Sequence, residues 1–233
     1  IDAFRSDTRR ALCIENLRSD FGHGSVNARK LMQSLSDGLA YELSKPDNNK
    51  VKMLFEEWRT LYGQVADMSV MQAESIVSEM AFSWNGGHVE SLSARLFVIH
   101  TYNSLLIKLL AAEIIASHGL TAIEYPAQSM SVIQKDESLI QDLEYNIECS
   151  KIFESAGIKG FVEEAIFSWY LDVARSSEEC STSILKSLRQ VLSVLSLYRL
   201  DKLDHTRDVL RDLYQELVPG KLRQSLGEFY TAD

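Results

Sequence analysis

The feature that most constrains the fold is a long run of mainly apolar residues between His88 and Ser117. Only a few strongly polar side chains interrupt its middle, at His100, Asn103, Lys108 and Glu113. The run is nearly long enough to span a membrane, but charges near the centre of a bilayer are costly. A helix that is apolar on almost every side is also typical of the centre of a soluble bundle. We therefore expect a long buried central helix and no membrane partner.

Helical periodicity also dominates the rest of the chain, and strand-like alternation is almost absent. Apolar residues recur at helical spacing over Ser6–Asp20, Ser25–Leu43, Val51–Val65, about Ser69–Ser83, Val162–Val173 and Ile184–Leu195. The signal is weaker from Leu120 to Gly160, where Pro126 and a polar run at 134–138 predict a loop with short helices, forming a lid or an insertion. The sequence thus predicts an all-α, bundle-like helical domain over residues 1–204, with a division into two subdomains near 119–160 left open.

Composition limits the kinds of partner. The chain has 24 lysine and arginine residues against 33 aspartate and glutamate residues, which gives a net charge of -9. Because lysine and arginine drive binding to phosphates, any contact with DNA must be local. Cys13, Cys149 and Cys180 show no disulfide or zinc pattern, and the five histidines show no metal-ligand spacing, so we expect no metal site and a cytoplasmic location. Since residue 1 is Ile1 and not methionine, we expect a piece of a longer polypeptide.

The C-terminal stretch carries the most specific pattern. An amphipathic helix over 205–218 is predicted to end at Pro219 and Gly220. The distinctive residues are Leu213-Tyr214-Gln215, Leu222-Arg223, Leu226 and Gly227-Glu228-Phe229-Tyr230-Thr231. In this order they resemble the entry into the catalytic domain of adenine-specific N6 DNA methyltransferases of restriction-modification or phage-defence systems. The chain departs from that family at Ala232, where the family usually has proline. Stretches 54–59 and 167–172 resemble the helical region upstream of the same domain.

This resemblance implies a function for the parent protein. Residues 205–233 would be a linking helix and the start of the catalytic domain, with Tyr230 and Thr231 near the cofactor S-adenosylmethionine. The partners it implies are DNA, the methyltransferase domain in cis and an upstream nuclease domain. The family's adenine-gripping Asn-Pro-Pro-Tyr segment is missing, because the three prolines are isolated from one another, and no complete glycine-rich cofactor turn is present. We therefore assign no catalytic residue and expect this chain not to methylate DNA alone.

The remaining candidates are basic residues in the C-terminal third. Lys186, Arg189, Arg207 and Arg211 give this part an intermittent basic character. A solvated helix face explains such residues, while phosphate contact is the functional alternative. The sequence is thus interpreted as a helical scaffold that positions a methyltransferase on DNA. An α-helical protein–protein interaction module with no enzymatic role is the competing hypothesis.

Overall fold

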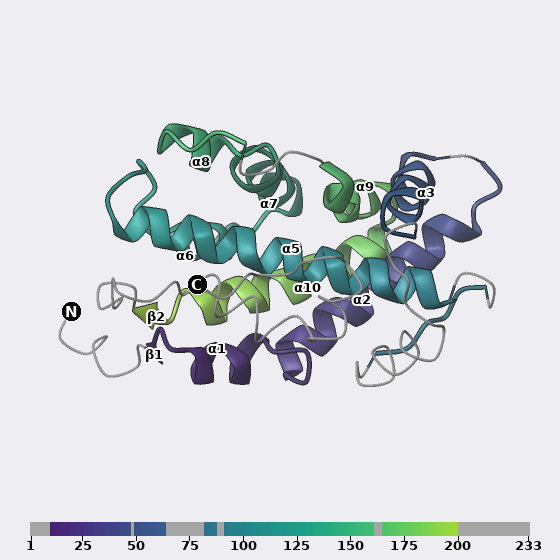
Figure 1. Ribbon diagram of the computed structural model, residues 1–233, viewed down its shortest axis with the longest axis horizontal. Helices are drawn as coiled ribbons and strands as arrows, with labels where there is room; N and C mark the ends of the chain where they lie inside the picture. The colour runs from purple at the N-terminus through teal and green to yellow at the C-terminus, as the bar shows by residue number, and fades with distance from the viewer. Residues whose placement is uncertain (1–9, 48, 64–81, 88–90, 161–164, 200–233) are drawn as a thin grey trace.

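The computed structural model describes residues 10–47, 49–63, 82–87, 91–160 and 165–199, and helices dominate these ranges (Figure 1). The α-helices are α1 (Ile14–Phe21), α2 (Val26–Ser44), α3 (Lys50–Gly63), α5 (Ser91–Ser117), α6 (Pro126–Ser131), α7 (Asp136–Asp142), α8 (Lys151–Ser155), α9 (Trp169–Ser176) and α10 (Glu178–Leu195). A π-helical segment η2 (Leu143–Glu148), a 3-10 segment η3 (Ala165–Ser168) and two short strands, β1 (Arg10–Ala11) and β2 (Tyr198–Arg199), complete them. The predicted all-α class is confirmed.

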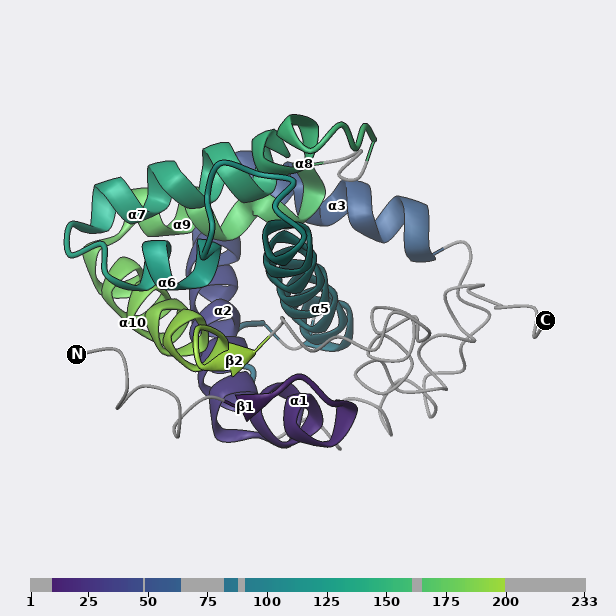
Figure 2. The ribbon, with the colours of Figure 1, turned by 90° about the vertical axis from the view of Figure 1, so that its left-hand side faces the viewer.

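Helix α5 lies at the centre of the bundle. In Figure 1 it runs across the middle of the molecule, with α3, α7, α8 and α9 above it, α1 below it, and α2 and α10 crossing behind it; Figure 2 looks nearly along it. Its length and composition would suffice for a membrane span, but most of its apolar window is buried by neighbouring helices. The predicted long buried central helix is confirmed, and the buried side chains around it form one cluster that extends from Leu17 to Tyr198.

Helices α2 and α10 form the most extensive helix pair. Each begins at a serine cap: Ser25 Oγ accepts the Ala28 N–H at 3.1 Å, and Ser177 Oγ accepts the Cys180 N–H at 3.3 Å. The caps explain why the first of these helices begins where the sequence predicted. Gly38 of α2 faces α9, which packs against both α2 and α10. A Cβ added at Gly38 would lie 2.9 Å from Val173 Cγ1 of α9. The absence of a side chain at Gly38 therefore permits the close packing.

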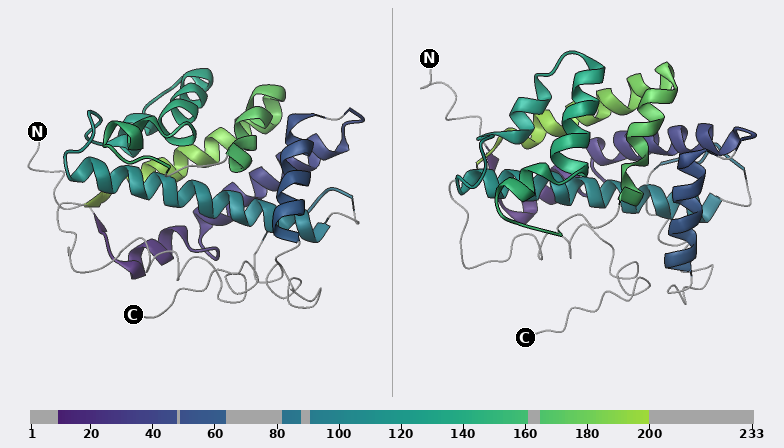
Figure 3. Two further views of the ribbon diagram at one scale, coloured as in Figure 1. Left: turned by 45° about the horizontal axis from the view of Figure 1, so that its top comes forward. Right: turned by 90° about the horizontal axis from the view of Figure 1, so that it is seen from above.

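The weakly patterned segment 120–160 contributes to the core. It forms α6, α7, η2 and α8, and these elements lie along one side of α5 (Figure 3). Leu139, Leu143, Ile147 and Phe153 are fully buried there. The prediction of short helices is confirmed. Each helix is too short to give a long periodic window, which is why its packing against α5 was not evident from the pattern.

The start of the first predicted helix is wrong. Within the predicted span Ser6–Asp20, Arg10 and Ala11 are extended and pair in parallel with Tyr198 and Arg199, and α1 begins only at Ile14. Pairing with a strand distant in sequence overrides the local helical pattern. Phe82 and Ser83, at the end of the helix predicted near 69–83, are not helical. The rest of that helix, and the one predicted over 205–218, lie outside the described residues.

Candidate functional site

The two described basic candidates lie on α10 and have different surroundings. Lys186 is exposed. Arg189 is half-buried, and its guanidinium donates to the carbonyl oxygens of Ile133 and Gln134, each at 3.2 Å from Nη2. It also forms an ion pair with Asp136 at 2.7 Å. The guanidinium of Arg189 therefore ties α10 to the connection between α6 and α7, whereas Lys186 faces solvent.

The remaining predicted site residues lie outside the part of the chain that the structure describes. These are Arg207 and Arg211, predicted to contact DNA, and Tyr230 and Thr231, predicted to lie near S-adenosylmethionine. All four stay predictions. Among the residues that are described, no group of three or more histidine, cysteine, aspartate or glutamate side chains is placed to hold a metal ion.

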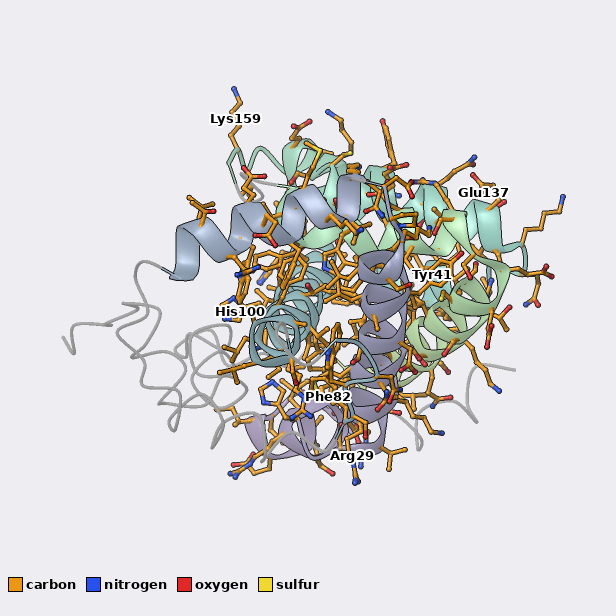
Figure 4. All side chains as sticks on the ribbon, turned by 90° about the vertical axis from the view of Figure 1, so that its right-hand side faces the viewer. Arg29, Tyr41, Phe82, His100, Glu137 and Lys159 are labelled. Atoms are coloured by element: carbon orange, nitrogen blue, oxygen red, sulfur yellow. The ribbon has the colours of Figure 1, made fainter. Side chains whose placement is uncertain are left out.

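Polar side chains of α5 bond to several neighbouring helices. His100 Nδ1 accepts a hydrogen bond from Trp58 of α3 at 3.2 Å, and Thr101 Oγ1 accepts one from Trp169 of α9 at 2.8 Å. Figure 4 shows His100 below α3, and the residue is buried. Burial lowers the pKa of His100 to about 4, so the imidazole is neutral at physiological pH. His100 is thus a hydrogen-bonded core residue of α5.

A buried ionic cluster joins α5 to η2 and α9. Lys108 Nζ lies 2.5 Å from Glu148 Oε2, and the Tyr170 hydroxyl donates to Glu148 Oε1 at 2.9 Å. Burial, followed by the charge of Glu148, raises the pKa of Tyr170 well above its ordinary value, so this hydroxyl keeps its proton. The sequence showed Lys108 and Glu113 as interruptions, but their partners are distant along the chain and were not predicted.

Glu113 is also a buried ionisable residue of α5, about one and a half turns beyond Lys108. Its carboxylate accepts the backbone N–H of Ala127 in the first turn of α6. Burial raises the pKa of Glu113 to about 7, and the hydrogen bond from Ala127 opposes this shift only in part. Glu113 therefore titrates near neutral pH, at a buried position where α5 meets α6.

The described surface includes two hollows. The larger, about 580 Å³, is open to solvent between α2 and residues 85–87, and its lining includes Asp37 and Tyr41. Asp37 Oδ1 already accepts hydrogen bonds from Gln33 and Asn85, each at 2.9 Å. The smaller, about 130 Å³, is lined mainly by apolar side chains with Asp142 and Asn146 at one side. Among the described residues, neither lining contains a histidine or a cysteine.

Comparison with known proteins adds no relative. No protein-family model, no curated protein and no solved structure matches the chain. Function must therefore be inferred from the chain's own residues, as fold class alone does not define it.

Proposed function

We propose that this chain is the helical, DNA-positioning region of an S-adenosylmethionine-dependent DNA adenine N6 methyltransferase of a restriction-modification or phage-defence system. One observation carries the proposal: residues 213–215, 222–223, 226 and 227–231 occur in the order found at the entry to that catalytic domain. Several residues in a fixed order are more specific than one short motif. A cytoplasmic location follows from this role and agrees with the free thiols of Cys13, Cys149 and Cys180.

The physical role that we propose for the helices is support and spacing. The bundle is held by a largely buried central helix whose polar side chains bond to several neighbours, and such a core deforms little. A rigid body of this kind holds a following catalytic domain at a defined position relative to DNA. The chemistry in the parent protein would be methyl transfer to a flipped-out adenine, with Tyr230 and Thr231 beside the cofactor. An upstream nuclease domain would add cleavage to the same polypeptide.

Contact with DNA, if made by the helices, would be local. Lys186 is exposed on α10, and Arg207 and Arg211 follow it in sequence. Arg189 is already bonded to the α6–α7 connection, so we propose that it supports the surface on which Lys186 lies. The net charge of -9 is unfavourable to DNA elsewhere on the surface.

The test compares the intact parent polypeptide with residues 1–233. Labelled methyl transfer from S-adenosylmethionine to adenine is measured on duplex DNA of varied sequence. The parent should methylate and the isolated chain should not. In the parent, Tyr230→Ala should raise the KM for S-adenosylmethionine, while Tyr145→Ala, at a tyrosine that is 61% exposed, should leave it unchanged. A parent that methylates no DNA would refute the proposal and favour the interaction module.

A further inference from the structure

Three side chains meet where the chain leaves the described bundle. The Asp20 carboxylate, at the end of α1, accepts a hydrogen bond from the Tyr198 hydroxyl at 2.7 Å and forms an ion pair with the Arg10 guanidinium. The Asp20 side chain is 14% exposed, and Tyr198 is buried. Burial and the neighbouring carboxylate raise the pKa of Tyr198, so the hydroxyl keeps the proton that it donates. We call this group the Arg10–Asp20–Tyr198 clasp.

Backbone pairing supports the same contact. Strand β1 pairs in parallel with β2, with Arg10 opposite Tyr198 and Ala11 opposite Arg199, and the Arg10 N–H donates to the Leu197 carbonyl at 2.8 Å. Both strands lie beside α1 in two perpendicular views (Figures 1 and 2). The ring of Tyr198 also packs near that of Phe21, with centroids 5.9 Å apart. We call residues 196–199, which follow α10, the exit segment. This segment is attached to the bundle through its backbone and through the side chain of Tyr198.

Asp20, the residue that binds the other two members of the clasp, is itself held against the bundle. Asn27 of α2 donates to the Asp20 carbonyl at 3.0 Å, and the Tyr102 hydroxyl of α5 donates to the Phe21 carbonyl. Asp20 therefore has a defined position relative to the two longest described helices. The Arg10 side chain is 40% exposed, and ion pairs with exposed partners contribute little to stability. The clasp affects the direction of the exit segment more than the stability of the fold.

We propose that Arg10, Asp20 and Tyr198 are positioning residues that set the direction in which the chain enters the catalytic domain. This inference rests on the proposed function. Helix α10 ends at Leu195, so release of the clasp would add residues 196–199 to the link. Four extended residues span up to about 13 Å, which lets the catalytic domain sample many positions relative to helices bound on the same DNA. The effective concentration of one DNA-contacting part near the other would fall.

The first test uses the full parent enzyme with Asp20→Asn and Tyr198→Phe, which keep the size of each side chain. Each should raise the KM for DNA about tenfold while kcat and the KM for S-adenosylmethionine stay the same. Glu144→Gln, which breaks the Arg175–Glu144 ion pair elsewhere on the surface, is the matched control and should change none of these values. A lower kcat with unchanged KM for DNA would indicate loss of folded enzyme only, and would overturn the inference.

A second measurement keeps the inference testable without activity. Spin labels at Gln190→Cys, on the exposed face of α10, and at Lys202→Cys report the exit direction in the chain of residues 1–233 with its native cysteines replaced by serine. Asp20→Asn should broaden the distance distribution between the labels, and Glu144→Gln should not. An unchanged distribution overturns the clasp. A parent that fails to methylate while Asp20→Asn still broadens the distribution refutes the proposed function and leaves the clasp established.

Discussion

Lys108 and Glu148 place opposite charges inside the bundle, with side chains only 8% and 3% exposed. Removing two charges from water is costly, and their attraction offsets that cost only when the remaining hydrogen bonds are satisfied. Tyr170 supplies one such bond to Glu148. At the scale of single residues, the pair therefore stabilises one particular docking of η2 on α5, and breaking it leaves a buried charge.

Lys108→Met tests this pair. The substitution should lower the free energy of unfolding by about 3–5 kcal/mol, because it leaves the Glu148 carboxylate buried without its cation. Adding Glu148→Gln should recover part of the loss, since Gln keeps an acceptor for Tyr170 and removes the charge. Urea unfolding measures each value. Lys151→Met, which breaks the exposed Lys151–Glu154 pair, should have little effect, and an equal loss in the two variants would contradict the prediction.

The two basic residues of α10 should respond differently to truncation. In the parent enzyme that we propose, Lys186→Ala should weaken DNA binding and reduce the slope of log affinity against log salt by about 0.9, as expected for one lost phosphate contact. Arg189→Ala should instead lower stability, because it leaves the carbonyl oxygens of Ile133 and Gln134 without their donor. Lys159→Ala, at an exposed lysine that projects from the top of the molecule in Figure 4, is the control. An unchanged salt slope in Lys186→Ala would show that Lys186 does not contact a DNA phosphate.

At the scale of elements, the corner formed by α2, α9 and α10 depends on small side chains. Ser34 of α2 lies within hydrogen-bonding distance of Ser183 and Ser187 of α10, at 2.8 and 3.0 Å. Gly38, one turn further along α2, has Val173 and Ile184 directly above it. Large residues at these positions would separate the helices, so the element packing depends on side-chain size and not on the hydrophobic pattern alone.

Gly38→Ala should therefore destabilise the protein although alanine favours helices. The added Cβ would lie 2.9 Å from Val173 Cγ1, and Val173 is a buried β-branched residue that cannot move away freely. Overpacking costs about 1–3 kcal/mol, which exceeds the gain in helix propensity of about 1 kcal/mol. Thermal or urea unfolding measures the loss. Gly24→Ala, whose Cβ would meet nothing within 4 Å, should not show it. Adding Val173→Ala should cost less in the Gly38→Ala background than in the wild type, and simple additivity would contradict the proposed contact.

At the scale of the whole molecule, stability depends on pH through groups with opposite effects. The pKa of Glu113 is raised from 4.5 to about 7, so its contribution to stability is fully present below about pH 4.5 and is lost as pH rises through about 7. The pKa of His100 is lowered from 6.5 to about 4, so its contribution is present above pH 6.5 and is lost as pH falls through about 4. A curve of the free energy of unfolding against pH therefore does not show the two contributions separately. The difference in this free energy between the wild type and a variant isolates one of them.

Glu113→Gln isolates the contribution of Glu113. Glutamine keeps an oxygen acceptor for the Ala127 N–H and cannot ionise. The stability of the wild type relative to this variant should fall by on the order of 2 kcal/mol between pH 5 and pH 8. Urea unfolding at both values measures the change. Glu124→Gln, at an exposed glutamate, is the control and should show a constant difference from the wild type. A constant difference for Glu113→Gln as well would mean that Glu113 ionises normally in the fold.

Much of the helical architecture was predictable from local patterns. Side-chain spacing and capping predict the central helix, the cap of α2 at Ser25 and the apolar faces of α3 and α10. They can do so because a helix forms its hydrogen bonds within one segment. Strand β1 was not predictable, because its partner β2 lies at the other end of the described chain. Of the candidate site, the exposure of Lys186 agrees with a solvated helix face. The bonding of Arg189 to the α6–α7 connection depends on contacts that no local pattern reveals.

The sequence alone determined that this protein is all-α, with one long apolar helix that its neighbours must cover. The polar residues within this helix indicated that α5 forms hydrogen bonds with its neighbours, since buried polar groups must be bonded. Only the tertiary structure decided that Glu148 meets Lys108, that Ala127 meets Glu113 and that Asp20 binds both Arg10 and Tyr198. The physical reason is range. Helical periodicity records which side of a segment is apolar, whereas the choice of partner depends on how distant segments pack together.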